Sequence, residues 1–305
     1  MSKRNSAEAK RAARERLRAE REKQAKRERI RRQLTVAGAV VVVLAIAGGI
    51  GLAVANMGDD GSGDATDWEA VQEQLDAASE GDGDNSDNSD NSDNADNADS
   101  GENAEGTPSY PIEAPAHASG EDGLTIEIGD EDAEHTLTLY EDPRCPACAS
   151  FEQLMGENVR QGMEDGTYRV QYVFGTFLDG VAGGTGSKNA LSALGAALNV
   201  SEEAFLDLHD ALYTAENHPP ESEDAFGDDE HLIELAQSVP ELENNRQFER
   251  DVRNSTFAAW ALQMSEKFNN AEGVEGTPTL AWNDEIIQTP QTAEEFEAMV
   301  EQNTQ

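Results

Sequence analysis

One run of apolar residues divides this chain of 305 residues into parts that fold under different rules. Residues 34–55 are twenty-two consecutive residues without a charged side chain. A helix of that length crosses a hydrocarbon layer of about 30 Å, so we expect a transmembrane helix here. A cleaved signal peptide is the alternative, because Ala53-Val54-Ala55 resembles a cleavage site, but the apolar core of a signal peptide spans only about 7–15 residues.

The charges on the two sides of this run have opposite signs. Residues 1–32 hold 14 of the 22 Lys and Arg residues and 5 of the 62 Asp and Glu residues, which leaves 8 basic and 57 acidic residues for the rest of the chain. The positive-inside rule places the N-terminus in the cytoplasm and residues 56–305 outside. We expect the basic segment 1–33 to lie against the anionic surface of the cytoplasmic membrane. The acidity of the exported part argues against nucleic acid as a partner.

Residues 56–118 have the composition of an acidic, disordered linker, rich in Gly, Asp, Asn and Ser. Within it, Trp68, Val71 and Leu75 recur at spacings of three and four, which predicts a short amphipathic helix over 66–79. The Asp-Asn repeat over 84–99 lacks the glycine and the glutamate of an EF-hand loop, so we predict no calcium site there.

Residues 119–305 have the periodicity of a folded α/β domain. Alternating apolar residues predict strands over 124–128, 135–140 and 167–174, and a helix over 145–164 lies between the last two. Further helices are predicted over 187–199, 201–215, 229–238 and 245–268, followed by a hairpin of strands 279–282 and 285–288 and by a closing helix over 292–301. This order predicts a β-β-α-β unit with a helical insertion at about 178–270.

The only two cysteines of the chain, Cys145 and Cys148, stand where the second predicted strand passes into a helix. A loop this short constrains the unfolded chain little, so chemistry explains the pair better than stabilisation does. At a helix N-terminus the first thiolate is stabilised by free N–H groups, which predicts Cys145 as the attacking thiol and Cys148 as the buried resolving thiol. Pro146 suits the first helical turn, and Ala147 adds no charge to the site. Half of a zinc site and an inert disulfide are the alternatives; the five histidines show no ligand-like spacing, so we predict no metal.

Two motifs in this domain resemble those of the thioredoxin superfamily, and within it the membrane-anchored, DsbA-like thiol–disulfide oxidoreductases of bacterial envelopes. One is Tyr-Glu-Asp-Pro-Arg-Cys-Pro-Ala-Cys over 140–148; the other is Gly-Val-Glu-Gly-Thr-Pro-Thr over 273–279; the helical block separates them. The resemblance implies a thioredoxin-like fold with a helical insertion. It also implies that Pro278 follows a cis peptide bond, faces the cysteines and positions the substrate, with Thr277 as its backbone partner.

The same resemblance implies thiol–disulfide exchange with exported proteins, without a cofactor, and a membrane redox partner that re-oxidises or reduces the pair. Disulfide formation is the expected direction, because the site faces an oxidising compartment. Two departures leave the direction open: strong oxidases of the family often have His where this chain has Ala147, and Thr277 also occurs in isomerase-like relatives. A reductase or isomerase, or a non-catalytic peptide-binding module, are the alternatives.

Overall fold

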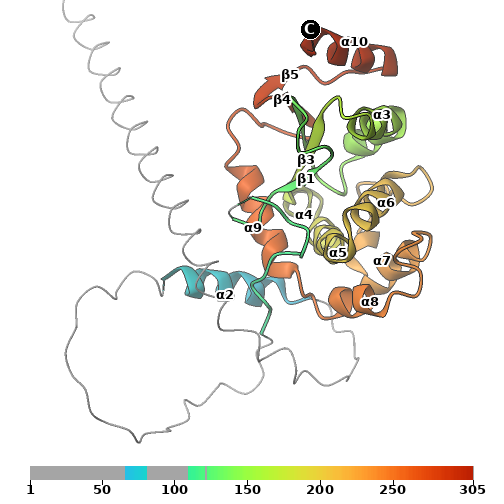
Figure 1. Ribbon diagram of the computed structural model, residues 1–305. Helices are drawn as coiled ribbons and strands as arrows, with labels where there is room; N and C mark the ends of the chain where they lie inside the picture. Colours follow the sequence, from blue (N-terminus) through green and yellow to red (C-terminus); the bar gives the residue numbers. More distant parts are fainter. Residues whose placement is uncertain (1–65, 81–108, 121, 305) are drawn as a thin grey trace, which may run out of the picture.

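The computed structural model describes residues 66–80, 109–120 and 122–304 (Figure 1). The predicted cytoplasmic segment 1–33 and the predicted transmembrane helix 34–55 lie outside these residues. None of the helices described is both long enough and apolar enough to cross a bilayer.

A mixed sheet of five strands forms the centre of the domain, in the order β1-β3-β2-β4-β5. The strands β2 and β3 are parallel, and the β1–β3, β2–β4 and β4–β5 pairs are antiparallel. Their bounds are Ile126–Ile128 for β1, Thr136–Glu141 for β2, Arg169–Phe174 for β3, Thr279–Trp282 for β4 and Glu285–Ile287 for β5. The strands β1, β2 and β3 lie within the segments that alternation predicts, and β4 and β5 lie in the predicted hairpin. Asn283 and Asp284 both take the positive φ that the tight β4–β5 turn requires.

Helices cover both faces of this sheet (Figure 1). The helix α3, Pro146–Glu164, connects β2 to β3 and contacts the closing helix α10, Ala293–Asn303; α9, Ala258–Asn269, packs against β3. Figure 1 shows α3 and α9 on opposite sides of the strands. The parallel β2–α3–β3 unit therefore carries the cysteine pair at the end of a central strand.

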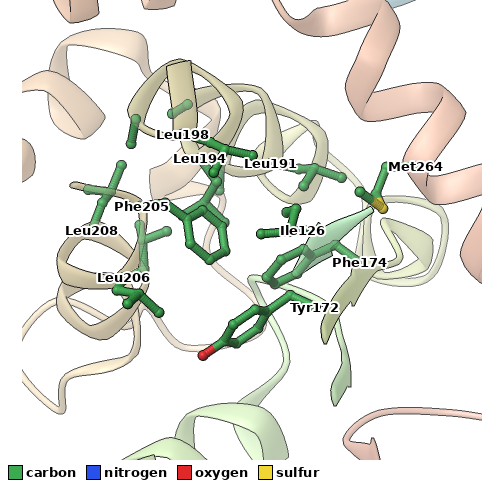
Figure 2. Packing of buried hydrophobic residues seen from close by; sticks show 14 of the residues in the cluster. Ile126, Tyr172, Phe174, Leu191, Leu194, Leu198, Phe205, Leu206, Leu208 and Met264 are labelled. Carbon is green, nitrogen blue, oxygen red and sulfur yellow. The ribbon is translucent and has the colours of Figure 1, made fainter. Parts of the chain in front are cut away.

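A helical insertion separates β3 from β4. Its helices are α4 (Phe177–Ala182), α5 (Gly186–Val200), α6 (Glu202–Tyr213), α7 (Asp229–Ala236), α8 (Arg246–Arg253) and α9, with a 3-10 turn at Ala225–Gly227. The central helix α5 is buried along most of its length. Figure 2 shows its leucines packed with aromatic side chains from β3 and α6. The rings of Tyr172 in β3 and Phe205 in α6 pack edge to face, with their centroids 5.3 Å apart. The insertion and the sheet thus share one core.

The last part of this insertion differs from the predicted helix over 245–268. The structure has two helices, α8 and α9, and the chain turns between them at residues 254–257. Ser255 adopts a left-handed conformation with φ of 51°, which ends the first helix. The apolar periodicity continues across this turn, so periodicity alone could not locate it.

The helix predicted within the linker lies on the surface of the domain. This helix, α2 (Trp68–Glu80), contacts α9, and Val71 is fully buried in the shared core. Gln74 bonds the backbone N–H and carbonyl of Tyr110, a residue that is itself buried. The folded unit therefore includes α2 and residues 109–118, and it begins before the predicted boundary at residue 119.

Candidate active site

Cys145 and Cys148 lie at the junction between β2 and α3. Cys145 occupies the N-cap position with extended backbone angles, and Pro146 takes the first helical position, where a missing N–H costs no hydrogen bond. The two cysteines are free thiols. Cys145 keeps 7% of its surface exposed and Cys148 none, whereas Pro146 and Ala147 are exposed. Of the two sulfurs, the one in Cys145 is closer to solvent, as the sequence predicts.

The surroundings of Cys145 lower the pKa of its thiol from the ordinary value to about 6. The hydrogen bond from the Cys148 thiol contributes most, and burial opposes it. The Thr277 side chain and the backbone N–H groups of Cys148 and Ala147 lower the pKa further. Ala147 therefore acts through its backbone, at the positive end of α3. At neutral pH this thiol is largely ionised, which is the reactive state.

We expect the alkylation rate of Cys145 in the reduced protein to rise through a midpoint near pH 6 and to be nearly constant above pH 7, because only the thiolate reacts. The thiolate absorbance at 240 nm should follow the same curve. A Cys148→Ser variant identifies the reacting thiol. A midpoint near about 8.5, the value of an ordinary cysteine, would show that the surroundings of Cys145 do not activate its thiol.

Cys148 has the opposite character. Burial raises the pKa of its thiol well above the ordinary value, and the nearby Cys145 and Glu141 raise it further. Cys148 is a buried thiol that stays protonated, whereas Cys145, three positions earlier, is ionised, and this asymmetry directs attack to a single sulfur. The two thiols thus differ in burial and in the direction of their pKa shifts.

Thr277 lies close to Cys145 and is followed by Pro278, just before β4 begins at Thr279. The Thr277–Pro278 peptide bond is cis, as the sequence predicts. The Thr277 carbonyl oxygen lies 3.6 Å from the Cys145 sulfur and accepts a hydrogen bond from the protonated thiol. The structure therefore brings together residues separated by 132 positions.

An ionic network around the buried Arg144 fixes the residues just before Cys145, and the sequence does not predict it. The Arg144 guanidinium, 1% exposed, bonds the Asp179 carboxylate at 2.9 Å, the Asp224 carboxylate at 3.1 Å and the Gly183 carbonyl at 2.8 Å. Asp179 and Asp224 also accept backbone N–H groups at the start of α5. Arg144 therefore ties the cysteine loop to the helical insertion. One feature of the sequence could have pointed to Arg144: basic residues are rare in this part of the chain, and Arg144 is one of only eight beyond residue 32.

Asp142 and Tyr213 complete the support of this loop. The Asp142 carboxylate accepts hydrogen bonds from the Arg144 and Leu178 N–H groups and from the Ser187 hydroxyl. Burial raises the pKa of Asp142 to about 6, although these hydrogen bonds oppose the shift. The Tyr213 hydroxyl donates to the Asp142 carbonyl at 3.1 Å, and its ring belongs to the same buried cluster as the two cysteines.

The fold and the cysteine pair define a thioredoxin-type domain with a dithiol at a strand-to-helix junction. Residues 121–302 match the family model described as Thioredoxin. The chain belongs to the thioredoxin family.

A curated relative and solved structures show which members of that family the chain is similar to. The chain is 23% identical over 175 residues to Disulfide bond formation protein D of Bacillus subtilis (strain 168), an alignment that covers 57% of this chain and 74% of the relative. The reduced form of the disulfide bond oxidoreductase DsbG from Mycobacterium tuberculosis is similar in structure, with a TM-score of 0.51, 22% identity, and 58% of this chain and 86% of that one covered. Oxidised BdbD from Bacillus subtilis is also similar in structure, with a TM-score of 0.50 and 22% identity. The match covers 63% of this chain and 98% of BdbD. The chain is thus similar to DsbA-type disulfide oxidoreductases.

Proposed function

We propose that this protein is a protein-disulfide oxidoreductase that forms disulfides in exported proteins by giving up the disulfide of Cys145 and Cys148. One observation carries the proposal: the thiol of Cys145, with a pKa of about 6, lies next to the fully buried Cys148 and 3.6 Å from the Thr277 carbonyl oxygen. The likeness to proteins named for disulfide bond formation supports the same activity.

The exchange takes two steps. A substrate thiolate attacks the Cys145 sulfur of the oxidised pair; the sulfur–sulfur bond breaks, Cys148 leaves as a thiolate that takes up a proton, and a mixed disulfide joins Cys145 to the substrate. The second substrate thiolate then attacks the substrate sulfur of that bond and releases the Cys145 thiolate. The substrate is oxidised by two electrons and the protein is reduced by two. A low pKa makes Cys145 the better leaving group in the second step.

The cis peptide supports the binding part of this scheme. With Thr277 next to Cys145 at the start of β4, its backbone is placed to pair with an extended substrate segment. Backbone pairing gives affinity without demanding one substrate sequence, which suits an enzyme that acts on many exported proteins. Pro278 and Thr277 are therefore the substrate-positioning residues of the proposal.

The direction of exchange follows from the stability of the reduced state. Ionisation of Cys145 stabilises the reduced dithiol, and a stabilised reduced form makes the disulfide a stronger oxidant. We expect a reduction potential more positive than about −200 mV when the pair is equilibrated with glutathione buffers. A potential near about −270 mV, the range of thioredoxin, would favour the reductase alternative instead.

We further propose that residues 34–55 anchor the protein in the cytoplasmic membrane with the N-terminus inside. The charge reversal across this uncharged run supports that topology, and a membrane redox partner would then re-oxidise the cysteine pair. Protease added to intact protoplasts should release a fragment containing Cys145 while a cytoplasmic marker protein stays whole. Protection of the fragment until the membrane is broken would contradict this topology.

A further inference from the structure

Three side chains from separate elements converge close to the cysteine motif. Glu141 is the last residue of β2, Glu152 lies in the second turn of α3, and His209 lies in α6 of the insertion. One possible ligand atom from each side chain lies within 4.8 Å of the other two. The sequence analysis does not predict this cluster, because its members are up to 68 positions apart.

Two members of the cluster are buried and Glu152 is half-buried, and the hydrogen bonding of the cluster is incomplete. Glu141 is 0% exposed and His209 is 1% exposed. Among the described residues, Glu141 Oε1, Glu152 Oε1 and His209 Nδ1 are buried atoms without a hydrogen-bond partner. Buried carboxylate oxygens are normally paired, so the Oε1 atoms of Glu141 and Glu152 lack a partner of the kind that such atoms usually have.

The charges in the cluster point to a cation as that partner. In the part of the chain that the structure describes, the ion pair of Glu141 is with His209, and neither Glu141 nor Glu152 has a Lys or Arg within ion-pair distance. Arg160, on the same helix as Glu152, pairs with carboxylates of α6 instead. A bound divalent ion would offset both carboxylates at once.

The orientation of His209 matches that of a metal-binding imidazole. Its Nε2 faces Glu141 Oε2 at 2.8 Å, and its Nδ1 lies 3.6 Å from Asp210 Oδ1. Metal-bound histidines commonly place the second ring nitrogen toward a carboxylate, which sets the orientation of the ring. Asp210 is held in turn by Arg160 at 3.0 Å. Two ligand atoms at about 2.0–2.2 Å from a tetrahedral ion lie about 3.4 Å apart, so the 2.8 Å hydrogen bond between Nε2 and Oε2 would open slightly to admit the ion.

We propose that Glu141, Glu152 and His209 form a binding site for a divalent transition-metal ion of the Zn²⁺ class. One imidazole nitrogen and two carboxylate oxygens are donors that suit Zn²⁺, whereas Ca²⁺ takes six to eight oxygen ligands. The ion would join β2, α3 and α6 behind the cysteine pair and so fix the insertion to the active-site helix. This proposal rests on the cluster alone and does not depend on the direction of disulfide exchange.

A metal titration of the oxidised full-length protein in detergent tests the proposal. Oxidation removes the cysteine thiolates, which also bind zinc, and excess Mg²⁺ occupies weak sites on the acidic linker. After dialysis against micromolar Zn²⁺, elemental analysis should find one more bound ion per chain in the wild type than in Glu152→Gln or His209→Gln. Glu157→Gln, at an exposed position of α3, should bind as the wild type does.

A spectroscopic readout on the wild type keeps the test valid if a variant fails to fold. Zn²⁺ should shift the imidazole resonances of one buried histidine, and Co²⁺ should give visible absorption without the intense sulfur band of a cysteine site. Equal zinc binding in wild type, Glu152→Gln and His209→Gln would overturn the proposal. So would the absence of stoichiometric zinc together with unmoved histidine resonances, which would leave a protonated His209 as the partner of Glu141.

Discussion

Replacing Cys145 with serine should abolish disulfide transfer to a reduced, unfolded substrate, with a loss of at least about 10³-fold. The remaining thiol, Cys148, is fully buried and its pKa is raised, and the variant has no second cysteine with which to form the transferable disulfide. The rate of disulfide formation in the substrate, followed by mass after quenching with an alkylating agent, measures this loss.

The matched variant is Cys148→Ser. It keeps the activated thiol but lacks the buried partner that resolves the mixed disulfide, so it should accumulate covalent adducts between Cys145 and substrate. Equal trapping by the two variants would contradict the roles assigned to the two sulfurs. Peptide binding and biological activity retained in Cys145→Ser would instead favour the non-catalytic binding module.

Arg144→Met should lower the free energy of unfolding by about 3–5 kcal/mol, because it leaves the buried carboxylate of Asp179 without its cation. The side chain of Arg144 is 1% exposed and that of Asp179 is 5% exposed, so water cannot replace the lost contacts. Equilibrium unfolding of the reduced protein in urea measures the change.

Arg253→Met is the control for this prediction. Arg253 also pairs with two carboxylates, Glu230 and Glu249, but its side chain is 33% exposed, and exposed pairs contribute about 0–1 kcal/mol. The loss of unfolding free energy in Arg144→Lys should lie between those of Arg144→Met and Arg253→Met. An ammonium group keeps the charge but cannot reproduce the planar contacts of the guanidinium. Equal losses for Arg144→Met and Arg253→Met would show that the network does not hold the cysteine loop.

The sequence pattern predicts those parts of the site whose structure depends on residues close together in the chain. The strand before Cys145, the helix that starts at Pro146 and the turn at Asn283 each depend on neighbouring residues, and all three lie where the sequence places them. The cis bond before Pro278 is implied by the resemblance of residues 273–279 to a motif of the family, and the structure has it.

The supporting contacts could not be predicted in the same way, because they join residues far apart in the chain. Arg144 meets Asp179 and Asp224 across 35 and 80 positions, and nothing in the pattern of either segment selects the other as a partner. The packing of α2 on α9 is a further case: its periodicity predicts a helix, while the surface that covers Val71 comes from residues more than 180 positions later.

The most direct test of the proposed activity is a single-turnover transfer measured by mass. The oxidised full-length protein is mixed with an equimolar reduced peptide that carries two cysteines, and both are quenched with acid and alkylated. The proposed mechanism predicts that the peptide loses two hydrogens while the protein gains two at Cys145 and Cys148, in equal amounts and with a transient adduct at Cys145. A peptide that stays reduced while the Cys145–Cys148 disulfide persists would contradict disulfide exchange as the function of this site.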